Sequence, residues 1–160
     1  MPDLDKTKLE RLDYKISKWM YTYGKPLLRY SLAITFIWFG YLKVIGASPA
    51  AELVARTAFW FDADIFIVVL GVWEMLIGLF LCFKPLLRIA ILLLFLQMPG
   101  TFLPLILFPE VCFENFPLEL TMEGQYIIKN LILISAAIVV GGTLRESELV
   151  EKNVKSADSQ

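Results

Sequence analysis

Apolar residues fall into four long blocks along the chain, and shorter polar stretches separate these blocks. The blocks cover roughly residues 26–46, 64–83, 86–108 and 123–142. A helix needs about 20 predominantly apolar residues to cross the hydrocarbon core of a bilayer, and each block is about that long. The second and third blocks are joined only by "KPLLR", which is short enough to require an antiparallel helical hairpin. The pattern therefore predicts an all-α chain, folded as an integral membrane four-helix bundle.

The residues ahead of the first block carry a different pattern, with apolar side chains at helical spacing and lysines on the other side. The apolar positions are Leu9, Leu12, Ile16, Trp19 and Tyr23. Such a helix would lie along the cytoplasmic interface of the membrane, and a solvated helix on a partner or on the bundle fits the pattern equally well. We therefore divide the chain into a cytoplasmic amphipathic segment (1–25), a four-span membrane domain (26–145) and a flexible polar tail (146–160).

Basic residues gather on one side of the predicted spans. The N-terminal segment, the short turn and the tail contain Lys6, Lys8, Arg11, Lys15, Lys18, Lys25, Lys84, Arg88, Arg145, Lys152 and Lys155. The two other connections contain one basic residue, Arg56, together with Glu52, Asp62, Asp64, Glu110, Glu114, Glu119 and Glu123. By the positive-inside rule both termini are cytoplasmic, which predicts a multi-pass protein of the bacterial cytoplasmic (inner) membrane. The first apolar run starts too late for a cleavable signal peptide.

Composition supports the membrane class and excludes several kinds of chemistry. The chain is 58% hydrophobic, with a mean hydropathy of +0.64, and average soluble domains are less apolar. Its net charge is −1 and it has no histidine, so nothing points to a nucleic-acid partner and the commonest metal and haem ligand is missing. The two cysteines, Cys82 and Cys112, form no CxxC pair. We expect no metal site.

The stretch "FPEVCFENFPLELT" (residues 108–121) is too polar to span a membrane and too apolar to be fully solvated. We expect it to form a lid over the outer end of the bundle, held down by Phe108, Phe113, Phe116 and Leu118. Cys112 would then lie in the lid as a free thiol, far from Cys82 near the inner surface.

Three charged residues lie inside the predicted spans, namely Lys43, Glu74 and Lys129, and Gln97 and Asn130 accompany them. A charge at the helix centre costs about 2.5 to 3.5 kcal/mol, so such residues usually face the bundle interior and pair. With a rise of about 1.5 Å per residue, Glu74 and Gln97 lie near the midplane, Lys129 about 5 Å and Lys43 about 10 Å further out. All four spans thus contribute a polar group to the outer half of the bilayer.

Helical spacing directs these groups inward. Small residues flank the carboxylate in the second span, which lets another backbone come close, and prolines bend the third span and open its carbonyls. The expected inward faces are Ala33, Phe36, Gly40 and Lys43; Gly71, Glu74 and Gly78; Gln97, Thr101 and Pro104; and the i, i+4 pairs Gln125 with Lys129 and Tyr126 with Asn130.

The simplest arrangement pairs Lys129 with Glu74 from a neighbouring helix, with Asn130 bonding across helices. Two buried cations then face one carboxylate, and an unpaired lysine should lose its proton or recruit an anion or a carbonyl. A pocket with surplus donors would suit a quinone head group or a small anion, with Trp38, Tyr41, Trp73 and Tyr126 as stacking walls. Equally, these side chains are structural glue between helices, each contributing about 1 kcal/mol.

Four segments, one on each span, carry a resemblance: "WFGYLKV" (38–44), "LGVWEMLIG" (70–78), "GTFLPL" (100–105) and "EGQYIIKNLILI" (123–134). In this order they resemble the DoxX-like superfamily of small four-helix membrane proteins, especially its YkgB-like branch. The resemblance covers about residues 26–145. It implies an association with quinone-reducing oxidoreductases or oxidative-stress responses, and the recurring polar positions it implies are Lys43, Glu74, Lys129 and Asn130. Thiol-quinone enzymes share the four-helix shape, but this sequence lacks their paired cysteines.

Three functions remain open at this point. The chain is an accessory redox subunit that binds quinone or docks on a membrane oxidoreductase, a small proton-coupled transporter that uses Glu74 and Lys129, or a non-catalytic scaffold. Four spans give a thin transport path, so transport would predict a homo-oligomer. The sequence leaves open whether the protein is an enzyme.

Overall fold

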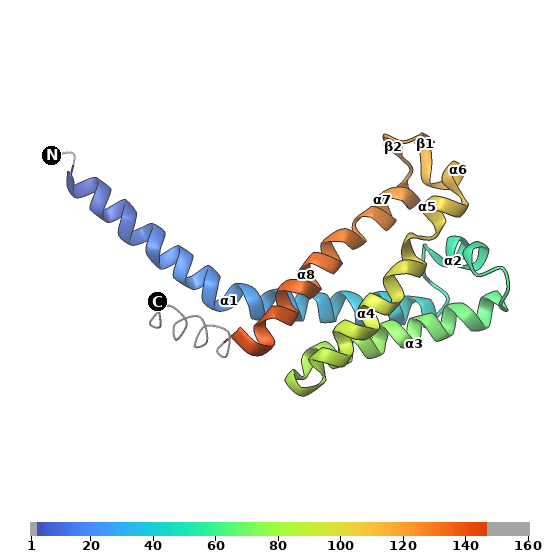
Figure 1. Ribbon diagram of the computed structural model, residues 1–160, viewed down its shortest axis with the longest axis horizontal. Helices are drawn as coiled ribbons and strands as arrows, with labels where there is room; N and C mark the ends of the chain where they lie inside the picture. The colour runs from blue at the N-terminus through green and yellow to red at the C-terminus, as the bar shows by residue number, and fades with distance from the viewer. Residues whose placement is uncertain (1–2, 147–160) are drawn as a thin grey trace, which may run out of the picture.

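Helices make up almost all of the computed structural model, which describes residues 3–146 (Figure 1). The long elements are α1 (Asp3–Val44), α3 (Ala63–Cys82), α4 (Leu87–Phe102) and the pair α7 (Met122–Ile128) and α8 (Asn130–Gly142). Shorter ones are α2 (Ala51–Thr57), η1 (Lys84–Leu86), α5 (Pro104–Leu107), α6 (Pro109–Cys112) and η2 (Thr143–Arg145). The strands β1 (Phe113–Asn115) and β2 (Glu119–Leu120) form a small antiparallel ribbon, the only β structure within residues 3–146.

Four helical stretches are long and apolar enough to cross a membrane: Lys8–Val44, Ala63–Cys82, Lys84–Leu107 and Met122–Arg145. They coincide with the four apolar blocks of the sequence, so the prediction of an all-α chain with four membrane-length helices is confirmed. The 3-10 turn η1 reverses the chain between α3 and α4, which lie side by side as the expected hairpin (Figure 1).

The amphipathic segment is not a separate helix, because α1 runs without interruption from Asp3 to Val44. Pro26 lies inside it, and a proline removes one helical hydrogen bond and bends the helix. Figure 1 shows the N-terminal part of α1 leaving the bundle at an angle. The apolar positions Leu9, Leu12 and Trp19 are exposed there.

One ionic contact ties this projecting helix to the end of the fourth span. The Tyr21 hydroxyl donates to Glu146 Oε1 at 2.8 Å, and Lys25 forms an ion pair with the same carboxylate. The hydrogen bonds from Lys25 and Tyr21 hold the pKa of Glu146 below its usual range. The rest of the predicted tail, residues 147–160, lies outside the described residues.

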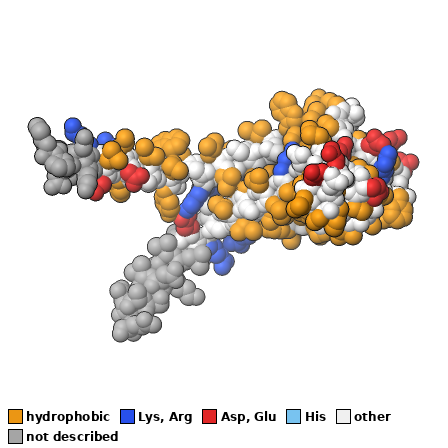
Figure 2. All heavy atoms as spheres, turned by 90° about the horizontal axis from the view of Figure 1, so that it is seen from above, with side chains coloured by type: hydrophobic (Ala, Val, Ile, Leu, Met, Phe, Trp, Pro, Cys, Tyr) orange, Lys and Arg blue, Asp and Glu red, His pale blue; other side chains and the backbone are white. Residues whose placement is uncertain are grey.

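Apolar packing is densest toward the end of the bundle that carries the α3–α4 turn. Ile77, Leu81, Leu87, Leu94 and Val140 are almost completely buried there, on α3, α4 and α8. Many other apolar residues of the spans are exposed, and Figure 2 shows broad hydrophobic areas along the bundle. The opposite end carries a cluster of acidic side chains (Figure 2). The polar residues of the spans lie between this core and the acidic end.

Candidate functional site

Close packing of α1 against α3 positions the central ion pair. A Cβ atom at Gly40 would lie 2.5 Å from the Gly71 carbonyl oxygen, and one at Gly78 would lie 2.6 Å from that of Ala33. The two backbones therefore touch, as the small residues of the sequence predict. Lys43 lies one turn beyond Gly40, and Glu74 one turn beyond Gly71, so their side chains reach toward each other across this contact.

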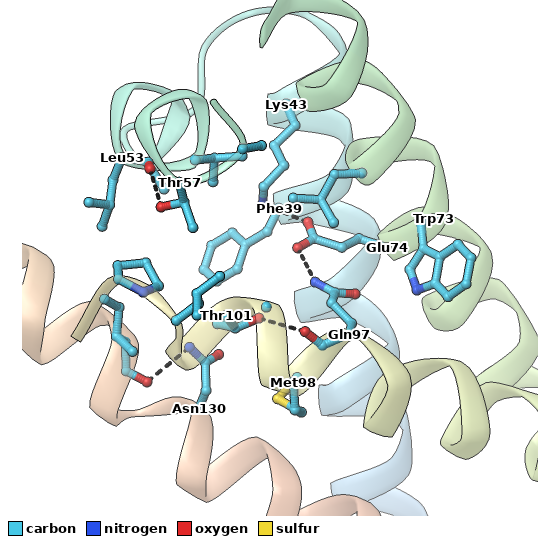
Figure 3. A pocket seen from close by; sticks show the side chains of 18 of the residues that line it. Phe39, Lys43, Leu53, Thr57, Trp73, Glu74, Gln97, Met98, Thr101 and Asn130 are labelled. Atoms are coloured by element: carbon cyan, nitrogen blue, oxygen red, sulfur yellow. Dashed lines mark hydrogen bonds and ion pairs between the residues drawn. The ribbon is translucent and has the colours of Figure 1, made fainter. Parts of the chain in front are cut away.

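Lys43 and Glu74 form a buried ion pair. The Lys43 ammonium donates to Glu74 Oε2 at 2.6 Å, and the two residues are only 5% and 7% exposed. Gln97 Nε2, from α4, donates to the other carboxylate oxygen at 2.7 Å (Figure 3). Because a carboxylate only accepts, it fixes the orientation of the Gln97 amide, whose Oε1 is buried without a partner. Both oxygens of Glu74 are therefore satisfied, by α1 on one side and α4 on the other.

The expected pairing of Glu74 with Lys129 is wrong. The partners of Glu74 are Lys43 and Gln97, whereas the Lys129 ammonium lies 3.8 Å from the centroid of the Tyr126 ring and 5.5 Å from that of Phe39. The prediction compared only the depths of the backbone positions of Glu74, Lys129 and Lys43. The long side chain of Lys43 carries its ammonium inward to the depth of the carboxylate. In addition, α3 packs mainly on α1 and α4, which puts it diagonally across from α8.

Lys129 is therefore the surplus cation of the site. It lines the cavity described below and, within residues 3–146, has no carboxylate partner. Its contacts with the two rings are cation–π interactions, each worth roughly 0.5–1 kcal/mol because Lys129 is exposed and not buried as expected. The hydroxyl of Tyr126 likewise has no hydrogen-bond partner among the described residues. Two donors on one turn of helix thus face the cavity without a protein acceptor.

The hydrogen-bond ladders of the third and fourth membrane-length helices are locally irregular beside these groups, although the backbone keeps right-handed helical dihedral angles there. In the third, at Leu103 between α4 and α5, Pro104 has no N–H to continue the ladder and leaves the Gly100 carbonyl without its usual partner. In the fourth, the irregular turn lies at Lys129 between α7 and α8. Backbone irregularity at membrane depth is tolerated where it lines a cavity or is buried in protein.

Asn130 lies beside the irregular turn of the fourth span. The prediction that it bonds across helices is wrong. Its Nδ2 donates to the Ile127 carbonyl at 2.9 Å and to the Tyr126 carbonyl at 3.4 Å. These are carbonyls of its own span, next to the irregular turn. The buried amide therefore supplies hydrogen bonds where the backbone ladder is irregular.

A cavity of about 400 Å³ connects these groups (Figure 3). Every span contributes to its wall: α1 through Phe39 and Lys43, α3 through Trp73 and Glu74, α4 through Gln97 and Thr101, and the fourth span through Tyr126, Lys129 and Asn130. Most of the remaining lining is aliphatic or aromatic. Binding sites for small molecules typically have volumes of about 300–1,000 Å³ and a mostly apolar wall with a few placed polar groups.

The segment that covers this cavity is α2, not the stretch 108–121. Leu53, Val54 and Thr57 of α2 line the cavity, and Thr57 is buried with its hydroxyl donating to the Leu53 carbonyl at 2.6 Å. No residue of 108–121 lines it. The prediction of a lid was therefore assigned to the wrong loop, and the apolar pair Leu53 and Val54 was the signal in the sequence for α2.

The stretch 108–121 instead closes on the start of α7 through its backbone. The Thr121 hydroxyl donates to the Val111 carbonyl at 2.7 Å, and a Cβ at Gly124 would overlap the Cys112 carbonyl oxygen. Phe116 and Leu118 were expected to hold this stretch down but are 74% and 87% exposed. They occupy the turn of the β ribbon, which points away from the bundle (Figure 1).

Three predicted pocket residues lie elsewhere, and one important residue was missed. Trp38 and Tyr41 are 64% and 52% exposed and line a separate shallow groove. Gln125 is exposed, with its Nε2 donating to the Leu120 carbonyl at 3.3 Å. Trp73 does line the cavity, and its Nε1 donates to the Leu93 carbonyl at 3.3 Å. Phe39 was missed because an aromatic residue in an apolar span gives no signal beyond packing.

The cysteines and carboxylates form no further chemical centre in the part of the chain that the structure describes. Cys82 and Cys112 are free thiols, and no group of three metal-ligating side chains occurs within residues 3–146. Burial, followed by the nearby carboxylates of Glu123 and Glu110, raises the pKa of the Cys112 thiol. This thiol is therefore poorly suited to act as a nucleophile.

No family model matches this sequence, and neither a curated protein nor a solved structure matches it.

Proposed function

We propose that the protein is a multi-pass protein of the bacterial cytoplasmic membrane with both termini in the cytoplasm. The four apolar helices support the membrane location. The orientation rests on charge: Lys84 and Arg88 flank the α3–α4 turn, while acidic residues dominate the connections at the other end.

Within this membrane setting the protein binds a quinone head group in the cavity, as an accessory subunit of membrane redox or oxidative-stress physiology. The observation that carries the proposal is the cavity itself, an apolar space of about 400 Å³ whose wall carries the unpaired donors Lys129 and Tyr126. A quinone presents two carbonyl acceptors on an apolar ring, so it matches a site with spare donors and no spare acidic group. When bound, it would supply reversible two-electron chemistry.

The chain's residues fit a quinone in three respects. The Lys129 ammonium and the Tyr126 hydroxyl would donate to its carbonyl oxygens. The rings of Phe39 and Trp73 would pack against its head group, and the apolar remainder of the wall would surround its tail. Lys43 would not take part directly, because Glu74 already holds its ammonium.

The four segments that resemble the DoxX-like superfamily support the same proposal. Each of them contributes to the cavity wall, through Lys43 in 38–44, Glu74 in 70–78, Thr101 in 100–105 and Lys129 in 123–134. Membership of that superfamily is part of this proposal, together with a membrane oxidoreductase, or further copies of the chain, as partner.

The test is native mass spectrometry of gently purified protein, followed by extraction and identification of the bound molecule. Titration with a short-chain ubiquinone, read by quenching of the fluorescence of Trp73 and Trp60, which both line the cavity, measures affinity. The Lys129→Met/Tyr126→Phe variant removes both donors and leaves the Lys43–Glu74–Gln97 network intact. Two lost hydrogen bonds, one from a charged donor, should weaken binding at least about tenfold.

Gln125→Met is the matched control, because Gln125 lies on the same helix as Lys129 but not on the cavity wall. It should bind quinone like the wild type. A small inorganic or carboxylate anion recovered in place of a quinone would redirect the proposal to anion binding at Lys129. A wild type that carries no molecule and shows no saturable quenching would refute both quinone binding and anion binding. The scaffold function would then remain, and the fully satisfied Glu74 carboxylate favours it.

Proton-coupled transport is a second candidate, favoured by the irregular turns beside the cavity. Discontinuous spans are a recurring feature of secondary transporters, and here the hydrogen-bond ladders of the third and fourth spans are locally irregular at Leu103 and Lys129, both of which line the cavity. Reconstituted vesicles with a pH-sensitive dye would detect substrate-driven proton flux. Loss of that flux in Glu74→Gln, with folding preserved, would support transport over simple binding.

A further inference from the structure

One face of α1 carries a row of apolar side chains that runs from Leu9 to the end of the helix at Val44. The steps along the row alternate between three and four residues, with one departure, two successive steps of four around Pro26. Such spacing is the a and d pattern of a coiled coil, and two steps of four are a stutter in it. We call this row the seam, and its members are Leu9, Leu12, Ile16, Trp19, Tyr23, Leu27, Tyr30, Ile34, Ile37, Tyr41 and Val44.

The seam faces away from the rest of the chain. Every seam residue is exposed except Ile37, which is half-buried. The contacts of α1 with its own bundle lie on the other side of the helix, where Tyr21 and Lys25 hold Glu146 and where Phe36 and Lys43 are buried. With 3.6 residues per turn, these residues point about 160° away from the centre of the seam. The bundle of the same chain therefore does not cover the seam.

The seam also extends well beyond the membrane-length part of α1. Figure 1 shows the N-terminal part of the helix projecting past the α3–α4 turn. Because α1 is continuous, Leu9 lies about 26 Å ahead of Pro26 along the helix axis. The polar region on each side of a bilayer is only about 5–8 Å thick. Lipid tails therefore cannot cover the first part of the seam, and an exposed apolar row of this kind indicates contact with another protein.

Charges beside the seam fit a second copy of the chain in parallel orientation. The seam places Lys8 and Lys15 at g positions and Asp13 and Met20 at e positions. In a parallel coiled coil, each g residue faces the e residue five positions further along the other helix. Lys8 of each copy thus faces Asp13 of the other, while Lys15 faces the uncharged Met20. An anionic membrane surface would instead repel Asp13, which disfavours lipid as the cover.

Within the membrane-length part, the seam contains a ready-made hole. A groove formed by α1 alone is lined by Ile34, Ile37, Trp38 and Tyr41, together with Leu42. The spacing i, i+3, i+4 and i+7 of the first four is that of the residues that receive one side chain of the facing helix in knobs-into-holes packing. In a parallel pair, the Ile37 side chain of the second copy lies at this level.

We propose that two copies of the chain form a parallel dimer through the seam, with their α1 helices paired from the projecting part into the membrane. Both copies insert in the same direction, so their α1 helices are parallel, as the pairing of Lys8 with Asp13 requires. The same face serves on both copies, as in a two-fold symmetric dimer. This dimer rests on the proposed membrane location and specifies the partner. It does not depend on quinone binding, because no seam residue lines the cavity.

The first experiment is oxidative cross-linking of single-cysteine variants of the full chain in lipid vesicles, in a Cys82→Ser/Cys112→Ala background. A d residue meets its own counterpart in a parallel pair, so Leu12→Cys should form an intermolecular disulfide. Tyr14→Cys is the matched control, because Tyr14 is similarly exposed but points about 160° away from Leu12. Leu12→Cys should cross-link at least about tenfold faster, since a disulfide needs Cα atoms within about 7 Å. Equal rates would indicate random collision and overturn the proposal.

The second experiment measures the dimer fraction by single-molecule photobleaching of a chain with one C-terminal fluorophore, over a range of protein-to-lipid ratios. Asp13→Lys replaces attraction by repulsion at both pairs and should weaken dimerisation about tenfold. Lys8→Glu/Asp13→Lys restores opposite charges and should return the dimer fraction to the wild-type value. A double variant as weak as Asp13→Lys would refute the parallel pairing.

A wild type that stays monomeric at every protein-to-lipid ratio would overturn the dimer. Binding of the seam to a membrane surface would then be supported if Asp13→Lys strengthened the contact of Trp19 with phosphatidylglycerol vesicles, read by its fluorescence. Quinone titration of the same samples keeps the two proposals apart. A monomer that still binds quinone refutes the dimer alone, and a dimer that binds no quinone refutes the quinone site alone.

Discussion

Removing one member of the Lys43–Glu74 pair should destabilise the protein far more than removing both. The two side chains are 2.6 Å apart and almost fully buried. Lys43→Met leaves the Glu74 carboxylate with Gln97 as its sole partner, and breaking a buried ion pair in this way costs about 3–5 kcal/mol. In Lys43→Met/Glu74→Met no charge is stranded, and the main loss is the Gln97 hydrogen bond, about 1 kcal/mol. The two substitutions should therefore be coupled by at least about 2 kcal/mol.

The assay is a double-mutant cycle measured by unfolding in mixed micelles with increasing dodecyl sulfate, followed by far-ultraviolet circular dichroism. Arg56 and Glu52 supply a matched control cycle, because they form an ion pair at 2.7 Å but are exposed. An exposed i, i+4 pair contributes about 0.3–0.5 kcal/mol. Burial is thus the main difference between the two cycles.

The reasoning is refuted if the coupling at Lys43 and Glu74 does not exceed the coupling at Arg56 and Glu52. It is also refuted if the double variant loses as much stability as the two single variants together. Polar contacts in membrane proteins average only about 0.6 kcal/mol, so a coupling near that value would mean that this pair behaves as ordinary polar packing.

Three further perturbations test other parts of the fold. Gly71→Ala places a Cβ 2.7 Å from a backbone oxygen of α1 and should cost about 1–3 kcal/mol of unfolding free energy, whereas Gly100→Ala, with nothing within 4 Å, should cost none; equal effects would contradict the contact between backbones. Asn130→Leu should cost about 1 kcal/mol and speed amide exchange at the irregular turn around Lys129; unchanged exchange would mean that the side chain does not support this turn. Cys112 should react with iodoacetamide more slowly than a free thiol at pH 8, because its raised pKa leaves less thiolate, and its rate should still rise above pH 9. A Cys82→Ser background isolates that rate, and alkylation at the rate of free cysteine would show the thiol to be accessible and unperturbed.

The helices and the faces they bury followed from the sequence because both depend on local properties. A block of about 20 apolar residues predicts a membrane-length helix without knowledge of its neighbours. The inward direction of Lys43 and Glu74 followed from helical spacing alone, and the glycines beside them predicted the close approach of α1 and α3. Those predictions hold in the structure.

The choice of partners did not follow, because it depends on which helices are adjacent and how far a side chain reaches. Lys43 and Lys129 were both candidates for Glu74, and depth along the axis favoured the wrong one. Similarly, two outer connections could have covered the cavity. The apolar residues of 108–121 favoured that stretch, but in the structure the amphipathic helix α2 covers the cavity.

The sequence by itself therefore determined four apolar helices and the inward faces of the first three, since hydrophobic periodicity is a property of each segment alone. On the fourth span Tyr126 and Asn130 turn inward as expected, but Gln125 and Lys129 are exposed. Only the tertiary structure decided that Glu74 is shared by Lys43 and Gln97, that Lys129 is left beside two aromatic rings, and that α2 closes the cavity. The physical reason is that pairing energy depends on distances between helices, and the glycine contacts that set those distances bring α1, and not the fourth span, against the carboxylate.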